Sequence, residues 1–328
     1  MEIQRKFPGV HWIWGGGISV VYEVHPRIVV KVPKYGEFEM DQFRKELGIY
    51  QIFSKHPPYP SIVQCFHSSG AGIFLEYMRD ICLSWRIQYN YIRDQQTMVV
   101  TSVEKLEPLF LRKEWKNNLA QAVAFLESLN VAHGDLRPEN ILLDRNRLKL
   151  YDFDCTAQVG SNCEACSGPY GRLLNSNEPD QGRYGTFGFL GPRTEQFALG
   201  SLHCLINYSF EVYGDCCLAD DLYEHRPKVV DLLQKMDFPK LDGDLLVDSI
   251  IDRCWHNKYA TVAELAANTK AIANKGSRDE AVQDCIGEDF LSKKEFCQDL
   301  EKRGLLDALS LEEPEQLGSR LEWYRHSL

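Results

Sequence analysis

The stretch HGDLRPENILLD, residues 133–144, followed by LKLYDFD, residues 148–154, decides the fold. Two short apolar runs in it flank a polar DRNR segment, which is typical of a strand, a turn and a second strand. Asn140 and Asp152 stand near the edges of these runs, and Asp135 lies in the segment before the first run. We therefore expect the three polar side chains to converge on one site.

The sequence on either side of the loop supports this expectation. Upstream, large apolar residues recur at helical spacing and predict a buried amphipathic helix: Trp115, Leu119, Ala122, Leu126 and Leu129. Pro138 can neither continue a helix nor join a central sheet ladder, so it favours an irregular loop. Carboxylate and amide oxygens are hard ligands that suit Mg²⁺.

The order and spacing of these residues resemble the catalytic loop and the metal-binding motif of the protein kinase superfamily. The resemblance implies an α+β, bilobal protein kinase-like fold, with a small, mainly β N-lobe at residues 9–78 and a larger, mainly α C-lobe at residues 79–274. It implies that Asp135 is the catalytic base, with Arg137 beside it where serine/threonine kinases usually carry lysine. Asn140 and Asp152 would hold Mg²⁺.

A glycine cluster lies where the resemblance implies a loop that covers the phosphates of ATP. The segment WGGGISVVYEV, residues 14–24, contains Gly15, Gly16 and Gly17, and glycine lets backbone amides approach phosphates closely. Two registers against the family's loop are open, and an ordinary hairpin turn is the alternative. Val21 would pack on the purine, or it would be plain core.

A lysine in a β-branched strand is the next part of the implied nucleotide site. Lys31 lies in RIVVKVPK, which resembles the strand that carries the family's phosphate-binding lysine. Such a lysine needs a carboxylate partner, and Glu46 is preferred because its segment has an apolar helical stripe. Glu37 and Glu39 are nearer in sequence, but we expect them to precede the helix and to be solvated.

Two further strands are expected after a proline-rich connection, at residues 62–66 and 72–78. The resemblance implies that the second strand ends in the segment that binds adenine. Leu75 would be the gatekeeper, and backbone groups of Glu76 to Met78 would contact the base.

The segment after Asp152 departs from the family's pattern at several positions. Asp154 replaces a glycine, and Gly134 stands where many kinases carry an arginine that receives an activating phosphate. Glu195 replaces the aspartate that braces the catalytic loop, and Arg193 replaces a glutamate. Thr194 is expected to cap the following helix.

Cys163 and Cys166 form a CxxC spacing in a segment that reads as a polar loop, with Cys155 nearby. A structural zinc site needs four ligands, and no second CxxC or close histidine pair completes the set. A redox role is also disfavoured, because the motif does not begin a helix after a strand.

Composition indicates a soluble enzyme inside the cell. The 328 residues are 44% hydrophobic, and the formal charge of -10 argues against nucleic acid as the main partner. The first residues lack the apolar core of a signal peptide, and no segment is long and apolar enough to span a membrane. The 11 cysteines then suggest reduced thiols in the cytoplasm or nucleus.

Residues 275–328 become more polar and carry mixed charges. We expect this C-terminal extension to form short helices that pack on the large lobe. Its last part is similar to the tail of divergent kinase-like proteins of filamentous fungi, with Trp323 and Tyr324 as anchors.

Three functions are compatible with these motifs. The first is an ATP- and Mg²⁺-dependent protein kinase that phosphorylates a hydroxyl, serine or threonine, of a protein substrate. The second is a pseudokinase scaffold, which the altered glycine loop, Asp154 and Arg193 favour. The third is a phosphotransferase of the aminoglycoside or choline kinase type, against which residues 184–200 argue because they resemble a protein kinase activation segment.

Overall fold

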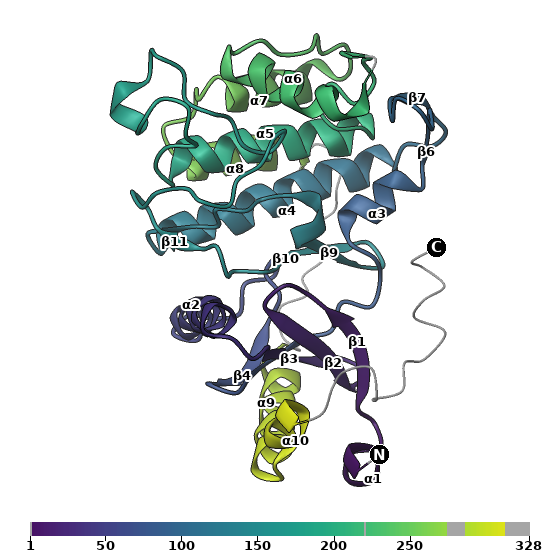
Figure 1. Cartoon of the computed structure of the whole chain (residues 1–328), viewed down its shortest axis with the longest axis vertical. Helices are drawn as coiled ribbons and strands as arrows, with labels where there is room; N and C mark the ends of the chain where they lie inside the picture. The colour runs from purple at the N-terminus through teal and green to yellow at the C-terminus, as the bar shows by residue number, and fades with distance from the viewer. Residues whose placement is uncertain (1, 220, 274–285, 312–328) are drawn as a thin grey trace. The chain divides into compact units, whose positions relative to one another are not determined.

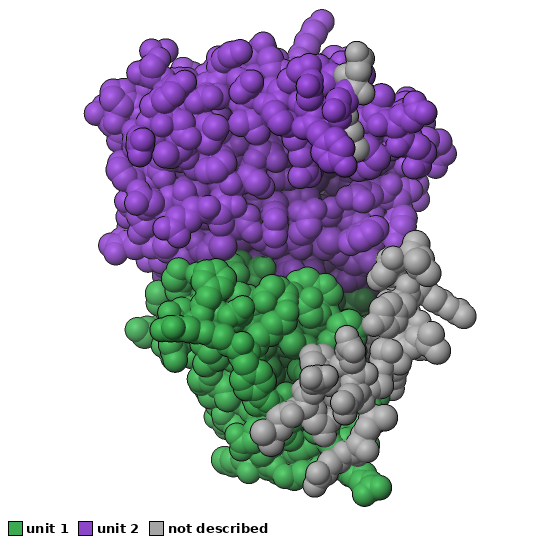
Figure 2. Space-filling model, in the orientation of Figure 1, with its two compact units in different colours: residues 1–79, 152–154, 279–328 green, residues 80–151, 155–278 purple. Residues whose placement is uncertain are grey.

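A computed structural model describes residues 2–219, 221–273 and 286–311, and it divides into two compact units. The small unit comprises residues 1–79, 152–154 and 279–328, and the large unit comprises residues 80–151 and 155–278 (Figure 2). The small unit is built on a five-stranded sheet and the large unit is mostly helical (Figure 1). The expected α+β, bilobal fold class is therefore confirmed.

The small unit contains one antiparallel sheet with the strand order β1-β2-β3-β5-β4. Its elements are α1 (Glu2–Lys6), β1 (His11–Gly15), β2 (Ser19–His25), β3 (Ile28–Pro33), α2 (Glu37–Phe53), β4 (Cys65–Ser69), β5 (Gly72–Glu76), α9 (Ile286–Lys302) and α10 (Leu305–Leu311).

Strand alternation gives the small sheet two different faces. On one face, Val20, Tyr22 and Val24 of β2 pack with Val30 and Val32 of β3 in a buried apolar cluster. Lys31 lies between the last two and therefore belongs to the opposite face. The same alternation that builds the core thus sets the direction of the lysine.

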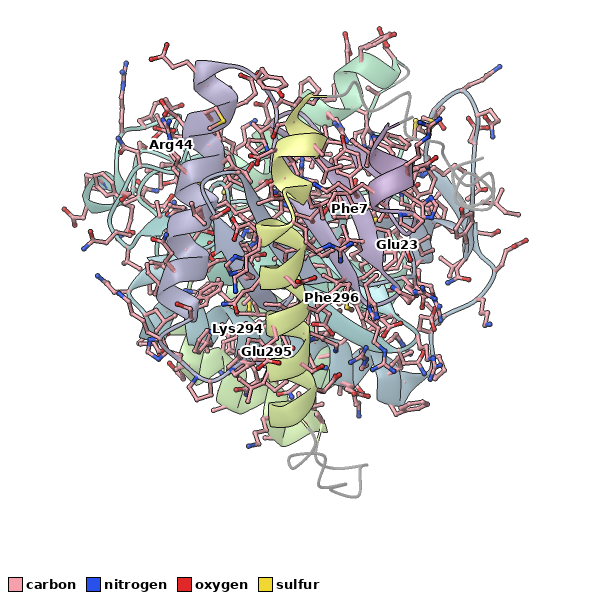
Figure 3. The ribbon with its side chains drawn as sticks, turned by 90° about the horizontal axis from the view of Figure 1, so that it is seen from below. Phe7, Glu23, Arg44, Lys294, Glu295 and Phe296 are labelled. Atoms are coloured by element: carbon pink, nitrogen blue, oxygen red, sulfur yellow. The ribbon has the colours of Figure 1, made fainter. Side chains whose placement is uncertain are left out.

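The C-terminal extension does not pack where we expected. Helices α9 and α10 belong to the small unit, and their buried Cys297, Leu300 and Leu306 join its apolar cluster. Phe296 of α9, labelled in Figure 3, packs edge-on against His25 with ring centroids 5.3 Å apart. The expectation was wrong because the sheet presents an apolar face to these helices, which sequence pattern alone did not reveal.

Parts of the extension lie outside the described residues. These are residues 274–285 and 312–328, which include the expected anchors Trp323 and Tyr324.

The large unit consists of helices and short two-stranded ribbons. Its elements are α3 (Leu83–Gln88), β6 (Tyr91–Arg93), β7 (Val100–Val103), α4 (Leu109–Ser128), β8 (Val131–Ala132), β9 (Ile141–Asp144), β10 (Arg147–Leu150), β11 (Ala157–Gln158), α5 (Pro192–Tyr208), α6 (Leu222–Gln234), α7 (Leu245–Trp255) and α8 (Val262–Ala273), with 3-10 turns at Pro138–Asn140 and Pro179–Gln181.

Helix α5 is the centre of the large unit. It is buried along almost its whole length and contacts α4, α7 and α8. Thr194 does not cap this helix from outside, as expected, but from its first turn. Its hydroxyl accepts a hydrogen bond from the Gly191 N–H at 3.0 Å, and the cap residue is Gly191.

Within the described ranges, no helix combines the length and apolar character that crossing a membrane requires.

Two elements of the small unit begin at positions other than those expected. Strand β4 starts at Cys65, because Ile62 and Val63 are buried just after a turn, which the hydrogen bond from the Ile62 N–H to the Tyr59 carbonyl closes. Helix α2 starts at Glu37, so Glu37 and Glu39 form its first turn and do not precede it. Carboxylates are favoured there because the amino end of a helix carries partial positive charge.

Candidate active site

Three charged residues meet on the face of the small sheet opposite its apolar core. Lys31 of β3 places its Nζ 2.6 Å from Glu46 Oε2 and 2.7 Å from Asp152 Oδ1. Val21 lies directly across the ladder from Lys31, and facing residues in a sheet share a face. The structure therefore brings together the lysine, the carboxylate of α2 and the aspartate that sequence analysis assigned to one site.

Burial makes this cluster electrostatically strong. Burial alone would lower the pKa of Lys31, but the carboxylates of Glu46 and Asp152 outweigh it and raise that pKa. Burial raises the pKa of Glu46, while the Lys31 ammonium acts in the opposite direction. The lysine therefore stays protonated and holds a fixed positive charge between two acids.

Aromatic packing holds Asp152 near Lys31. Phe153 is fully buried and meets the rings of Tyr50 and Phe53 of α2 edge-to-face, at 5.6 and 5.1 Å between centroids. Asp152 itself adopts a φ of 66°, which is uncommon for a residue with a side chain. The same helix thus anchors the segment that contains Asp152 and supplies Glu46.

Gly15 ends β1, and Gly16 and Gly17 lie in the tight turn that leads to β2. The Gly16 N–H donates to the Ser19 carbonyl at 2.9 Å, and the Lys34 ammonium donates to the Gly16 carbonyl. A side chain on Gly17 would meet no atom within 4 Å, so its surroundings are open. Sequence reasoning missed Lys34, because only the folded turn brings it to the glycines.

The segment at the end of β5 has one backbone N–H group that is free to donate a hydrogen bond to an adenine base. The N–H groups of Glu76 and Tyr77 already donate to the carbonyls of Gln64 and Arg27, at 2.8 and 3.0 Å. Among the described residues, the Met78 N–H has no such partner. Of the amides in the expected adenine segment, Met78 therefore keeps the free donor.

In the large unit, the catalytic loop gathers three of the expected residues. Asn140 Nδ2 donates to both the carbonyl and the Oδ2 of Asp135, each at 2.9 Å. The Arg137 guanidinium lies 3.2 Å from the same Oδ2. These contacts hold the Asp135 carboxylate in place and turn the amide oxygen of Asn140 away from it.

His133 connects the loop to the strand that leads into Asp152. The N–H of Asp135 donates to His133 Nδ1 at 3.3 Å, so the proton of the neutral ring resides on Nε2. That nitrogen lies 3.1 Å from the carbonyl of Tyr151, to which it donates. Sequence analysis assigned no role to His133, although it opens the motif.

Glu195 braces the loop from α5. Its two carboxylate oxygens accept the N–H groups of His133 and Gly134, at 2.9 and 3.3 Å. Burial raises the pKa of Glu195 to about 7, against the opposing effect of these two donors. The longer side chain therefore reaches the backbone groups that an aspartate would reach in the family's pattern.

The glutamate of the family's pattern pairs with an arginine. Among the described residues, Arg193, which takes its place, forms no ion pair with a carboxylate. Its buried guanidinium donates to the Phe187 carbonyl, and burial lowers its pKa. The neighbouring Arg172 pairs with Glu178 at 2.7 Å instead. Arg193 and Arg172 are thus both bound by groups of the same segment, the Phe187 carbonyl and the Glu178 carboxylate.

Each of the two units carries donor atoms of a kind that suits Mg²⁺. Asp152 offers carboxylate oxygens, and Asn140, whose nitrogen is engaged by Asp135, offers an amide oxygen. These are the hard ligands that Mg²⁺ prefers. The open surroundings of Gly17 leave room for a phosphate near backbone amides.

Comparison with known proteins shows the family of the chain. The sequence pattern of the protein kinase domain matches residues 15–192, more than half of the chain. The phosphorylase b kinase gamma catalytic chain, liver/testis isoform, of Mus musculus is 29% identical over 136 residues, which cover 40% of this chain and 30% of the mouse protein. The probable serine/threonine-protein kinase gdt2 of Dictyostelium discoideum is 25% identical over 261 residues, 75% of this chain and 14% of that protein.

A third relative is CBL-interacting protein kinase 10 of Oryza sativa subsp. japonica, 27% identical over 141 residues, or 40% of this chain and 27% of the rice protein. The chain thus spans less than a third of the length of each of these relatives. The fold and the sequence match together define an α+β protein with a kinase-like fold. The chain belongs to the protein kinase domain family.

Proposed function

We propose that the chain is an active protein kinase that transfers the γ-phosphoryl group of ATP to a serine or threonine hydroxyl of a protein. The observation that carries the proposal is the contact of Lys31 with both Glu46 and Asp152. This arrangement fixes a positive charge where phosphates need one and keeps a carboxylate oxygen for a metal ion. Relatives named as serine/threonine kinases support the acceptor class.

Each group of residues would have a separate role in the proposed reaction. Mg²⁺-ATP supplies the phosphoryl group and the charge that neutralises it. Lys31 and the amides of the glycine turn would bind phosphates, Val21 and the backbone of Glu76 and Met78 would bind the base, and Asn140 and Asp152 would hold Mg²⁺. Asp135 would orient the acceptor hydroxyl, and Arg137 would offer positive charge beside it.

The pseudokinase scaffold remains the second candidate function. Asp154, which acts to raise the pKa of Glu46, adds negative charge beside the cluster that must accept a polyphosphate. The proposal includes a protein substrate, and it includes an intracellular setting, in which the 11 cysteines of the sequence would be reduced thiols.

Nucleotide binding tests the proposal first. Mg²⁺-ATP at 100 times its Kd should stabilise the wild type by about 2.7 kcal/mol, read as a rise in melting temperature. Lys31→Met and Asp152→Ala should lose most of that rise, each compared with its own nucleotide-free protein. Lys45→Met, at an exposed position on α2, is the matched control and should keep it. A wild type without any rise at millimolar nucleotide would establish the scaffold.

Phosphoryl transfer tests the assigned base. Asp135→Asn should bind Mg²⁺-ATP as the wild type does, yet transfer labelled phosphate to protein acceptors at least 100-fold more slowly, because the hydroxyl loses its carboxylate partner. Undiminished transfer by this variant would overturn the role of Asp135. Transfer to choline or aminoglycosides but not to proteins would reassign the acceptor class.

A further inference from the structure

Cys163 and Cys166 lie in contact in a segment to which the proposed reaction gives no role. Their sulfur atoms are 2.9 Å apart, and the Cys163 thiol donates a hydrogen bond to the Cys166 sulfur. Cys163 is buried at 8% exposure, whereas Cys166 is half-buried. The segment is not the solvated polar loop expected from sequence, because both cysteines pack with Ala132 and Leu190 in a small apolar cluster.

The cysteine pair touches the catalytic loop. The Cys166 thiol donates a hydrogen bond to the carbonyl of Gly134 at 3.4 Å. Gly134 directly precedes Asp135, and its own N–H donates to Glu195. The thiol therefore helps to hold the peptide group next to the proposed base.

The two thiols differ in acidity. The hydrogen bond between the sulfurs lowers the pKa of Cys163 and raises that of Cys166. Cys163 is thus the thiol that ionises first, and the thiolate is the reactive form. A zinc site is not supported, because no group of three or more His, Cys, Asp and Glu side chains is placed to hold a metal ion among the described residues.

We propose that Cys163 and Cys166 are a redox modification site, which a hydroperoxide converts into a reversible intrachain disulfide. The Cys163 thiolate attacks the peroxide oxygen and becomes a sulfenic acid, with release of water or an alcohol. The Cys166 thiol then attacks that sulfur, which closes the S–S bond and releases water. A disulfide bond is about 2.05 Å long, so the sulfurs need to approach by less than 1 Å.

Oxidation removes the contact with the catalytic loop, since a disulfide sulfur has no proton to donate to Gly134. This consequence rests on the proposed kinase function. We expect phosphoryl transfer by the oxidised protein to fall several-fold and to recover after a thiol reductant. Hydrogen exchange over residues 133–140 should rise in the oxidised protein, a structural readout that needs no activity.

Mass spectrometry tests the disulfide itself. The full chain is treated with hydrogen peroxide, alkylated and digested with trypsin, which yields residues 150–172 with Cys155, Cys163 and Cys166 in one peptide. Wild type and Cys155→Ser should show loss of two hydrogens with fragments that link Cys163 to Cys166. Cys163→Ser and Cys166→Ser should not. Alkylation of both thiols in peroxide-treated wild type, while the exposed Cys217 is oxidised, would overturn the proposal.

The outcomes separate the disulfide from the kinase reaction. A disulfide that involves Cys155 would refute the assigned pair. A correct disulfide with unchanged hydrogen exchange and unchanged transfer would refute the coupling to the catalytic loop. Transfer that is absent even from the reduced wild type counts against the kinase function alone, because the mass shift and the exchange still report on the cysteines.

Discussion

Gly134 occupies a position that a side chain cannot fill. Its φ of 79° lies in the left-handed region, and a Cβ there would lie 2.7 Å from the carbonyl oxygen of Cys155. Sequence analysis noted only the loss of an arginine at this position. The structure shows that the backbone beside Asp135 is shaped for glycine, so restoring a larger residue would distort the loop.

The cost of a side chain at Gly134 can be separated from the cost of its backbone angle. Gly134→Ala should destabilise the protein more than Gly160→Ala, which has a φ of 93° but no atom within 4 Å of the added Cβ. A left-handed alanine costs about 1–2 kcal/mol, and the clash at Gly134 should add at least about 1 kcal/mol more. Chemical unfolding of both variants measures the difference. An equal decrease in the free energy of unfolding for both variants would show that the Cys155 carbonyl moves away from the added Cβ at no energetic cost.

Some residue contacts were predictable and others were not. The pairing of Lys31 with Glu46 could be predicted, because the apolar stripe of α2 fixes which side of the helix faces the sheet. The contact of Lys34 with Gly16 could not, since it depends on how the turn folds back. The roles of Asp135, Asn140 and Met78 in binding or catalysis stay predictions.

At the scale of elements, the helices α9 and α10 are part of the core of the small unit. Leu306 of α10 is 2% exposed and lies so close to Gly72 of β5 that a Cβ on that glycine would be 2.6 Å from Leu306 Cδ2. The glycine and the leucine therefore fit each other, and changes at the two positions should not be additive.

A double-mutant cycle tests this fit. Leu306→Ala should lower the free energy of unfolding by about 2–4 kcal/mol through lost burial and a cavity. Gly72→Ala should cost about 1–3 kcal/mol in the wild type through overpacking, but much less when Leu306 is already alanine. Denaturant unfolding of the four proteins measures the coupling, and the exposed Leu291→Ala on α9 should change little. Additive losses would place the two residues out of contact.

The positions of the periodic elements around the site could be predicted from the sequence, whereas the packing of the C-terminal extension could not. Strand-like alternation predicted β2, a β-branched run predicted β3, and the helical repeat predicted α4. The partner of α9 could not be read in this way, because an amphipathic stripe shows that a face is buried without showing against which surface. Strand β4 began late for a related reason, since buried residues in a turn resemble those in a strand.

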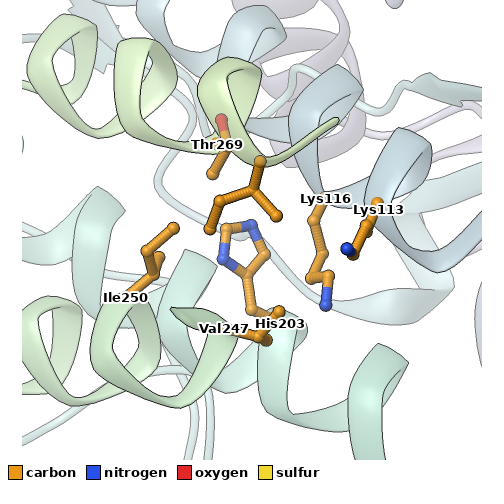
Figure 4. A pocket seen from close by; sticks show the side chains of 7 residues that line it. Lys113, Lys116, His203, Val247, Ile250 and Thr269 are labelled. Atoms are coloured by element: carbon orange, nitrogen blue, oxygen red, sulfur yellow. The ribbon is translucent and has the colours of Figure 1, made fainter. Parts of the chain in front are cut away.

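At the scale of the whole molecule, Lys116 is a buried lysine of the large unit that forms no ion pair with a carboxylate among the described residues. Lys116 of α4 is buried beside His203 at a cavity of about 10 Å³ (Figure 4). Its ammonium lies 3.2 Å from Asn207 Oδ1, and no acidic side chain is within ion-pair distance among the described residues. Burial, with a contribution from Arg112, lowers the pKa of Lys116 to about 7.

This lysine should make the stability of the chain depend on pH. Between pH 7 and the ordinary lysine pKa, the unfolded chain binds more protons than the folded one, so stability rises with pH by at most about 1.4 kcal/mol per unit. Lys116→Met removes the buried charge, and we expect it to be more stable than the wild type near pH 6. Its advantage should shrink as the pH is raised to 10.

Urea unfolding of both proteins at several pH values measures this effect, because other titrating groups cancel in the comparison. Lys105→Met, at an exposed site, should differ from the wild type by less than about 0.5 kcal/mol at every pH. A constant difference between Lys116→Met and the wild type from pH 6 to 10 would contradict the assigned shift.

The small unit is assembled from three separated stretches of chain, and its apolar cluster includes Leu309. During synthesis, residues that belong to the large unit leave the ribosome before that cluster is complete. The apolar sheet face formed by residues 1–79 therefore stays uncovered after all residues of the large unit have been synthesised. This reverses the usual order in which amino-terminal parts fold first, and we expect the nascent sheet to be prone to aggregation until α9 and α10 have been synthesised.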